Sequence, residues 1–234
     1  MSHKYLVISG ASTGIGESTA QLFQSKGWTV INISRQNCQF AVKNFNIDLT
    51  AENWADIYSE QLQVAVAGAE KICLVHNAAY YIKDTIMKLP AQQLRIVLEA
   101  NVVAPSILNQ IFLPLMPAGS SILYIGSTLS DKAVSHAASY VTSKHAILGL
   151  MRATCQDLDG KHIHTCCICP GTTDTEMLRK HVQYEEQQLE AMRAMNAFKR
   201  LVKPNEIAEL IEFAAEQPVI NGSVLHANLG QIAT

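Results

Sequence analysis

Residues 5–16 read Tyr-Leu-Val-Ile-Ser-Gly-Ala-Ser-Thr-Gly-Ile-Gly, and this stretch decides the fold. Tyr5–Ser9 is a short apolar run that predicts a buried strand. The glycines after it allow a sharp turn. The helical pattern Ile15–Lys26 follows directly and ends at Gly27, a typical residue just after a helix. A strand, a glycine-rich turn and a helix in this order are typical of the first unit of a nucleotide-binding α/β domain.

The same alternation of short apolar runs and helical patterns continues along the chain. The further predicted strands are Thr29–Ser34, Asn44–Ile47, Lys71–Val75, Ser121–Ile125, Ile163–Cys169 and Ser223–Ala227. The further predicted helices are Glu52–Ala67, Ala91–Leu113, Ser139–Leu158 and Pro204–Glu216. Strands alternating with helices predict a parallel sheet covered on both faces. We therefore expect an α/β fold with one domain over residues 1–234: a Rossmann-type, doubly wound parallel sheet of seven strands in three αβα layers.

Composition excludes several classes of function. Of the 234 residues, 48% are hydrophobic and 16% charged, which predicts a folded protein with a substantial core. The net charge is −2, so we expect no broad basic surface for nucleic acid or for a membrane. The apolar runs are shorter than a membrane span of about 18 residues, and the N-terminal one is too short for a secretion signal. We expect a cytoplasmic protein with reduced cysteines.

The glycine-rich turn predicts a phosphate site. Gly10, Gly14 and Gly16 let the backbone approach a ligand closely. The start of the following helix offers free N–H groups and a partial positive charge, which suit a pyrophosphate. Without its context the motif could equally be an ordinary turn, but the strand before it and the helix after it favour dinucleotide binding.

The end of the second predicted strand indicates which dinucleotide binds. Folds that select NAD place a carboxylate here for the ribose hydroxyls, but this chain has Ser34 and Arg35. A guanidinium can pair with a 2′-phosphate, with Ser12 and Ser34 adding hydroxyl groups. We predict NADP rather than NAD; the alternative is that Arg35 is only a solvated surface charge.

Tyr140 and Lys144 are four residues apart and share one face of a predicted helix. A free tyrosine, with a pKa of about 10, is a poor acid or base at neutral pH. A neighbouring ammonium stabilises the phenolate and makes a tyrosine useful for proton transfer. Such pairs are also common on ordinary helix surfaces, so the pair needs support from other motifs.

The set of motifs resembles the short-chain dehydrogenase/reductase family over nearly the whole chain. The motifs, in the family's order, are Gly10–Gly16, His76-Asn77-Ala78-Ala79, Asn101, Ser127, Tyr140 with Lys144, and Pro170-Gly171. Tyr140 follows Ser127 by thirteen residues, a spacing similar to that of the family. The resemblance also implies the strand order 3-2-1-4-5-6-7.

The resemblance implies a role for each matched residue. Tyr140 would donate or accept the proton, Lys144 would support it and hold the nicotinamide ribose, and Ser127 would bind the substrate oxygen. Asn101 would join a water-linked proton relay. The expected cofactor contacts are Gly10, Ser12, Thr13, Gly14, Ile15, Gly16, Ser34, Arg35, Asp48, Leu49, Asn77, Ala78, Ala79, Tyr140, Lys144, Pro170, Gly171, Thr173 and Thr175.

Asn101 can also be singled out without the resemblance, from the residues around it. Pro105, four positions later in a predicted helix, has no N–H to donate to the carbonyl of Asn101. We therefore expect a distorted helix with a free carbonyl there, available to an ordered water. A kink without a role in proton transfer is the alternative.

The chain departs from the family pattern in three places. Ser9-Gly10 replaces Thr-Gly, His76 to Ala79 replaces Asn-Asn-Ala-Gly, and Asn228-Leu229-Gly230 replaces Asp-Gly-Gly. These changes concern cofactor and C-terminal contacts rather than the Ser127, Tyr140 and Lys144 set. The run from His162 to Cys169 contains metal-ligand types, but alternation along a strand would divide them between two faces, so we expect no metal site.

We therefore expect an NADP(H)-dependent oxidoreductase that interconverts a carbonyl and an alcohol, with no metal. For the small-molecule substrate, a steroid, sugar, pteridine, quinone or acyl-chain carbonyl are all open. A non-catalytic sensor of NADP(H) is the main alternative, and a sugar-nucleotide epimerase or dehydratase is a weaker one. Segment Thr172–Leu201 is expected to be a mobile lid over the substrate. On the resemblance, we expect a homodimer or homotetramer joined through the helices around Ala91–Leu113 and Ser139–Leu158.

Overall fold

A single parallel sheet organises the molecule. The computed structural model describes residues 3–183 and 185–231, so residues 1–2, 184 and 232–234 of the expected domain lie outside the described part. The sheet has seven strands in the order β3-β2-β1-β4-β5-β6-β7, as expected. The strands are β1 (Lys4–Ser9), β2 (Thr29–Ser34), β3 (Lys43–Asn46), β4 (Lys71–His76), β5 (Ser121–Ile125), β6 (His164–Pro170) and β7 (Val224–Ala227).

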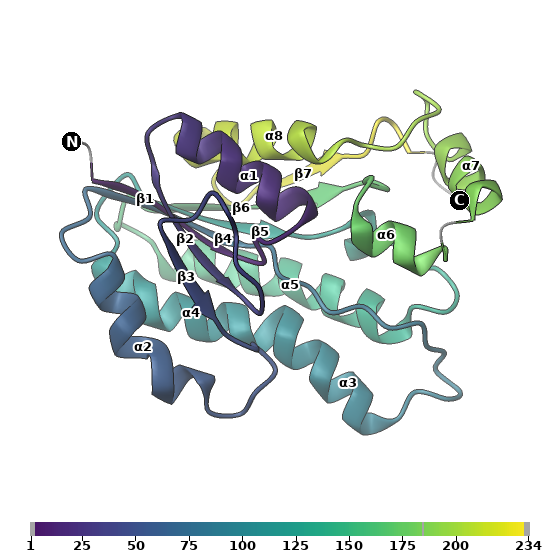
Figure 1. The fold of residues 1–234 in the computed structure, drawn as a ribbon, viewed down its shortest axis with the longest axis horizontal. Coiled ribbons are helices and arrows are strands. Elements are labelled where there is room, and N and C mark those ends of the chain that lie inside the picture. Colours follow the sequence, from purple (N-terminus) through teal and green to yellow (C-terminus); the bar gives the residue numbers. More distant parts are fainter. Residues whose placement is uncertain (1–2, 184, 232–234) are drawn as a thin grey trace.

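Helices cover both faces of this sheet (Figure 1). One face carries α1 (Gly14–Ser25) and α8 (Pro204–Glu216). The other carries α2 (Trp54–Ala65), α3 (Ala91–Leu98), α4 (Ala104–Phe112) and α5 (Ala138–Asp157). Two short helices, α6 (Glu176–His181) and α7 (Glu186–Ala194), lie in the segment between β6 and α8. The three-layer Rossmann-type α/β fold is confirmed.

Alternation along the strands builds two separate cores. In β1, Leu6 and Ile8 pack with Phe23 of α1 on one face, whereas Val7 joins the core on the other face. This is the period of two expected for a strand that is covered on both sides. The two cores hold the sheet between its helical layers and keep the carboxyl ends of the strands at one edge.

The same alternation divides the cysteines of β6. Cys166 faces one core, and Cys167 and Cys169 face the other, with their Sγ atoms 3.9 Å apart. Among the residues that the structure describes, no group of three or more His, Cys, Asp or Glu side chains comes together as a metal site would require.

The long helix expected over Ala91–Leu113 is distorted at Asn101. Between α3 and α4, Glu99–Val103 forms a π-helical turn. Pro105 follows as one of the first residues of α4. A proline cannot make the α-helical bond back to the residue four positions earlier, so the backbone adjusts locally to a wider turn. The distortion expected from the sequence is present, as a π-helical turn.

One helical run among the described residues, Ala91–Leu115, is long and apolar enough to cross a membrane by length and composition. It has 25 residues, and 50% of its most apolar window is buried inside this fold. One side of this helical run therefore packs against the sheet as part of the core, and this packing accounts for its apolar composition.

A chain of buried side chains leads from the end of β4 to α5. The Nε2 atom of His76 lies 2.8 Å from Oδ1 of Asn109, whose amide donates to the Tyr124 hydroxyl at 2.7 Å. That hydroxyl lies 2.9 Å from Oγ1 of Thr154, which donates to the Leu150 carbonyl. Since an amide oxygen only accepts, the His76 proton is assigned to Nε2. The Nδ1 atom is then an acceptor, and it has no partner among the described residues.

This buried histidine makes stability depend on pH. Burial lowers the pKa of His76 from 6.5 to about 4. Because the folded state binds the proton less readily than the unfolded state, the free energy of unfolding falls as pH falls from 6.5 toward 4. The expected loss is about 3 kcal/mol. Denaturant unfolding at several pH values measures it. His76→Asn, which does not titrate, should show a loss smaller by that amount, and parallel profiles of the two proteins would contradict the prediction.

Candidate active site

The glycine-rich turn after β1 is packed so closely that there is no room for side chains at Gly10 and Gly16. A Cβ atom on Gly16 would lie 2.0 Å from the carbonyl oxygen of Gly10, and one on Gly10 would lie 2.9 Å from Cα of Ala78. Gly10 also has a φ of +73°, in the region that favours glycine. The turn therefore presents bare backbone, which is what close approach of a pyrophosphate requires.

Side chains from neighbouring strands hold this turn. The Asn77 amide donates to the carbonyls of Ser9 at 3.1 Å and of Gly10 at 2.8 Å. The Ser9 hydroxyl accepts from the backbone N–H groups of Asn77 and Ala78, both at 3.1 Å. On the other side, Oδ1 of buried Asn32 accepts from the N–H of Ala11 at 3.2 Å. Asn32 was not identified from the sequence, because a lone polar residue inside an apolar strand gives no signal of its partner.

Helix α1 begins inside the turn and points its first N–H groups outward from the sheet edge. Thr13 is its N-cap residue, and within the described residues its side chain makes no capping hydrogen bond. The N–H groups at the start are thus available to an anion. A Cβ on Gly14 would lie 3.0 Å from Cγ2 of Thr175, so Thr175 lies next to the turn. Ser12 and Ile15 are half-buried beside it.

The expected adenine and ribose contacts lie at the ends of β2 and β3. Arg35 is exposed, and Ser34 is buried with its hydroxyl donating to the Gln36 carbonyl at 2.7 Å. Asp48 accepts from the N–H and the hydroxyl of Thr50, and these bonds, with a smaller effect of the Arg35 charge, lower the pKa of its carboxyl. Leu49 is buried in the core.

Ser127, Tyr140 and Lys144 come together at the carboxyl end of β5. The Nζ of Lys144 donates to the Ile125 carbonyl at 2.7 Å and lies 5.4 Å from the centre of the Tyr140 ring. The Ser127 hydroxyl accepts from the N–H of Leu129 at 3.1 Å. Lys144 is 4% exposed, so its charge is held in a site largely shielded from water.

Asn101 joins this group through its side chain. Its Oδ1 accepts from the N–H of Tyr80 at 2.6 Å, and its Nδ2 donates to the Tyr80 carbonyl and to the Ser143 hydroxyl. Ser143 lies on α5 between Tyr140 and Lys144. Asn101 therefore fixes both the chain after β4 and the helix that carries the Tyr–Lys pair.

Asp84 caps the helix that carries Tyr140, and sequence reasoning missed it. One oxygen of its buried carboxylate accepts from the N–H of Ser139 at 3.1 Å, and the other accepts from the Ser139 hydroxyl. A carboxylate is favourable at the start of a helix. Because Asp84 is 55 positions away from Ser139 in the sequence, a local sequence pattern cannot predict this cap.

Asp84→Ala is expected to lower the free energy of unfolding by about 3 kcal/mol, since two buried donors lose a charged acceptor. The rate of turnover should fall as well, because Tyr140 directly follows the residue that is capped. Denaturant unfolding and steady-state kinetics measure the two effects. Asp131→Ala removes a half-exposed carboxylate and should cost less than about 1 kcal/mol. Equal stability of the two variants would refute the capping role.

The chain after β6 returns to the same edge of the sheet. Pro170 ends β6, and a Cβ on Gly171 would lie 2.8 Å from Cα of Asn228. The Thr173 hydroxyl donates to the Gly171 carbonyl at 2.9 Å. Ala79, at the other side of the site, is half-buried. The expected residues that follow strands thus lie at or just beyond the carboxyl ends of those strands, where ligands of such folds bind, whereas Asn101, Tyr140 and Lys144 come from helical segments.

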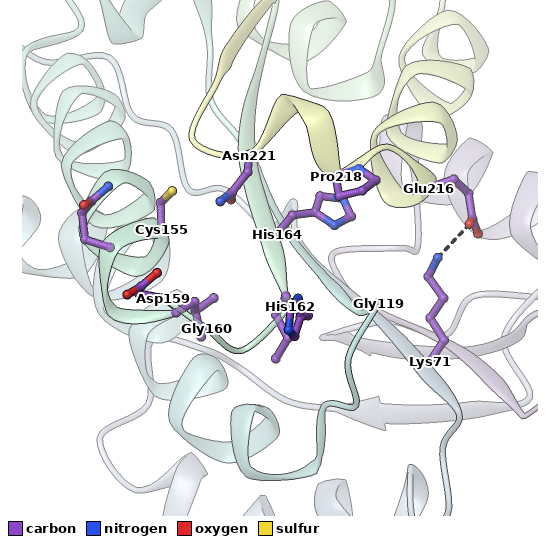
Figure 2. Close-up of a pocket in the computed structure, with 13 residues that line it drawn as sticks. Lys71, Gly119, Cys155, Asp159, Gly160, His162, His164, Glu216, Pro218 and Asn221 are labelled. Carbon is purple, nitrogen blue, oxygen red and sulfur yellow. Dashed lines mark hydrogen bonds and ion pairs between the residues drawn. The ribbon is translucent and has the colours of Figure 1, made fainter.

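A hollow of about 980 Å³ opens at the opposite edge of the sheet (Figure 2). It is lined by residues at the amino ends of β4, β5 and β6, and the Lys71–Glu216 ion pair lies on one side of it. None of the residues expected for chemistry lines it. Although this hollow is large, the candidate site is therefore assigned to the carboxyl edge of the sheet and not to the hollow.

The fold is of the Rossmann class, and the candidate site lies at the carboxyl edge of its sheet. Residues 10–231 match a family model described as enoyl-(acyl carrier protein) reductase. The chain belongs to the short-chain dehydrogenase/reductase family. It is 29% identical to protein FixR of Bradyrhizobium diazoefficiens, over 97% of this chain and 86% of that protein. It is 26% identical to the 3-oxoacyl-[acyl-carrier-protein] reductase FabG of Thermotoga maritima, over 98% of both chains.

Solved structures agree on the fold. The aldohexose dehydrogenase of Thermoplasma acidophilum superposes with a TM-score of 0.89 at 24% identity, covering 99% of this chain and 96% of that one. A short-chain dehydrogenase of Burkholderia cenocepacia is in complex with NADP (TM-score 0.86, 22% identity, 98% of both chains). A 4-hydroxyisoleucine dehydrogenase is complexed with NADH (TM-score 0.85, 23% identity, 97% and 98%). Proteins of this fold thus use either nucleotide.

Proposed function

We propose that the protein catalyses NADP(H)-dependent interconversion of a carbonyl and an alcohol, with Tyr140 as the general acid and base. The observation that carries this proposal is the placement of Tyr140 and Lys144 on one face of α5, beside Ser127 at the carboxyl end of β5. A tyrosine next to a shielded ammonium is equipped to give up and regain a proton.

The residues present fit a dinucleotide cofactor. At Gly10 and Gly16 the backbone has no room for a Cβ atom, so a phosphate can approach the backbone of the turn directly. The start of α1 has N–H groups that can donate to the phosphates. When bound, the cofactor supplies or accepts the hydride. Asn77, Ala78 and Ala79 would border its ribose, and Asp48 with Leu49 its adenine. Pro170, Gly171, Thr173 and Thr175 would border the nicotinamide and phosphates.

In the direction of reduction, the Tyr140 hydroxyl gives its proton to the substrate oxygen. The Ser127 hydroxyl uses a lone pair for the N–H of Leu129, so its own proton can be donated to that same oxygen. There it stabilises the negative charge that develops during the reaction. Lys144, held by the Ile125 carbonyl, stabilises the phenolate left on Tyr140 and would also hold the nicotinamide ribose. The backbone carbonyl of Asn101 would lead the returning proton to Lys144 through water.

The choice of NADP rests on Arg35. This guanidinium is exposed at the end of β2, where a 2′-phosphate would lie, whereas the Ser34 hydroxyl is already donated to Gln36 and would have to turn to help. Arg35→Ala is expected to lower the NADPH to NADH ratio of kcat/KM by about thirtyfold, the loss of one charge-assisted contact. Arg152→Ala, an exposed arginine in the second half of α5, is the matched control. An unchanged ratio in Arg35→Ala would refute the assignment.

The test of the proposed function is oxidation of NADPH and NADH in the presence of a panel of carbonyl compounds. A steroid, a sugar, a pteridine, a quinone and a thioester-linked 3-oxoacyl chain, together with aryl and alkyl aldehydes, cover the open substrate classes. Tyr140→Phe serves as the blank for every compound. The proposal requires at least one carbonyl that the protein reduces and the blank does not.

We further propose that segment 172–201 is the substrate lid and that the protein works as a homodimer or homotetramer in the cytoplasm. Support for the lid is that His181, at the end of α6, touches Tyr81 and so reaches the surroundings of Tyr140. Support for assembly is that only half of the most apolar window of Ala91–Leu115 is fully buried within one chain, and that Val103 in this run is an exposed apolar side chain. That surface fits the helical interface expected from the family.

A further inference from the structure

Three aromatic rings are in contact in sequence, and one of them is the ring of Tyr140, the proposed acid. The Tyr81 ring lies 5.2 Å from the Tyr140 ring, at an interplanar angle of 73°. The same Tyr81 ring lies 4.8 Å from the imidazole of His181, at 86°. Both contacts are edge-to-face, the arrangement that aromatic pairs favour. Tyr81 therefore stands between the proposed catalytic residue and helix α6.

The position of Tyr81 is fixed from both sides. Asn101 binds both the N–H and the carbonyl of Tyr80, the residue just before it. Three residues after it, Asp84 is tied to Ser139 at the start of α5. The short stretch that carries Tyr81 is thus fastened to α5 and to the π-helical turn before α4. A ring held in this way is a wall of the site rather than a freely moving surface group.

We propose that Tyr81, together with His181, is a specificity-determining residue that selects substrates with a flat, apolar group, such as an aryl ring, next to the carbonyl. This inference rests on the proposed function, because the substrate oxygen must reach the Tyr140 hydroxyl and the rest of the substrate then borders the adjoining ring. Aromatic walls bind flat apolar groups by burial and by edge-to-face contact.

The His181 side chain is uncharged at neutral pH, as an apolar wall of the substrate site requires. The imidazole is half-buried, and burial, with a smaller effect of the Lys83 charge, lowers its pKa below the usual 6.5. At neutral pH the ring is therefore uncharged and behaves as an aromatic surface. Tyr81 is likewise half-buried, and burial raises the pKa of its hydroxyl, so this ring is also uncharged.

The experiment compares kcat/KM for benzaldehyde and for butanal in the wild type, Tyr81→Phe and Tyr81→Leu. The wild type should favour benzaldehyde. Tyr81→Leu should lower kcat/KM for benzaldehyde about tenfold, mainly through KM, and change that for butanal less than about twofold. Tyr81→Phe keeps the ring and should keep the preference. His181→Leu should lower the same ratio.

The outcomes separate this inference from the function on which it rests. A wild type that favours butanal, or a Tyr81→Leu variant that loses both activities equally, overturns the role of Tyr81 while reduction by Tyr140 stands. If the wild type reduces no carbonyl beyond the Tyr140→Phe blank, the proposed function fails, and the specificity proposal fails with it. The Kd of NADPH, measured in each variant, should stay within about twofold of wild type, and a larger change would indicate damage to the cofactor site rather than lost selection.

Discussion

Tyr140→Phe is expected to lower kcat for carbonyl reduction by about a thousandfold, while the Kd of NADPH stays within about threefold of wild type. The substitution removes one hydroxyl and keeps the ring, so the edge-to-face contact with Tyr81 is preserved. Lys144 keeps its bond to the Ile125 carbonyl. The site loses its proton donor without losing its shape.

Steady-state kinetics and titration of NADPH fluorescence measure the two quantities. Tyr58→Phe removes a phenol hydroxyl from α2, far along the chain from the site, and is the matched control. A Tyr140→Phe protein with wild-type turnover would remove the general acid from the mechanism. A wild-type protein that binds NADPH tightly and reduces nothing would favour the sensor alternative instead.

Local patterns were sufficient to predict the sheet. Most strands could be located because they are short apolar runs, and the predicted strand boundaries differ from those of the structure by one residue at most. The run predicted as Ile163–Cys169, for example, forms a strand at His164–Pro170. The helix predicted over Glu52–Ala67 is shorter, Trp54–Ala65, because the ends of helices depend on contacts that propensity does not encode.

Candidate site residues could be identified from the sequence where they lie in short motifs. The glycine turn, Tyr140 with Lys144, and Ser127 all lie in short motifs, and the structure brings them to one edge of the sheet. The supports of these motifs come from distant positions. Asn32, Asp84 and Tyr81 act across gaps of about twenty residues or more, and one sequence holds no record of such pairings.

The π-helical turn could be predicted only in part from the sequence. Pro105 predicts that the hydrogen bond to Asn101 is lost, but not how the backbone responds. The structure resolves this with the wider turn at Glu99–Val103, which accompanies an inward-facing Asn101 held by Tyr80 and Ser143. The helix distortion at Asn101 was predicted correctly, whereas its three side-chain hydrogen bonds could be seen only in the folded structure.

Gly16→Ala is expected to weaken NADPH binding by about a thousandfold and to lower thermal stability. The added Cβ would lie 2.0 Å from the Gly10 oxygen and 2.7 Å from the Asn77 amide, so the turn must open and its bonds to Asn77 must break. An open turn no longer directs its N–H groups at a pyrophosphate.

Gly149→Ala is the matched control for this substitution, because Gly149 also lies inside a helix but a Cβ there meets nothing within 4 Å. Because the added Cβ meets no atom within one chain and lies away from the turn, alanine in place of glycine should leave NADPH binding unchanged and should not lower thermal stability through strain within the chain. Calorimetric titration with NADPH and thermal unfolding of both variants measure these effects. Wild-type NADPH affinity in Gly16→Ala would mean that the turn is not the phosphate site, because no pyrophosphate could be held against a backbone displaced by a buried methyl group.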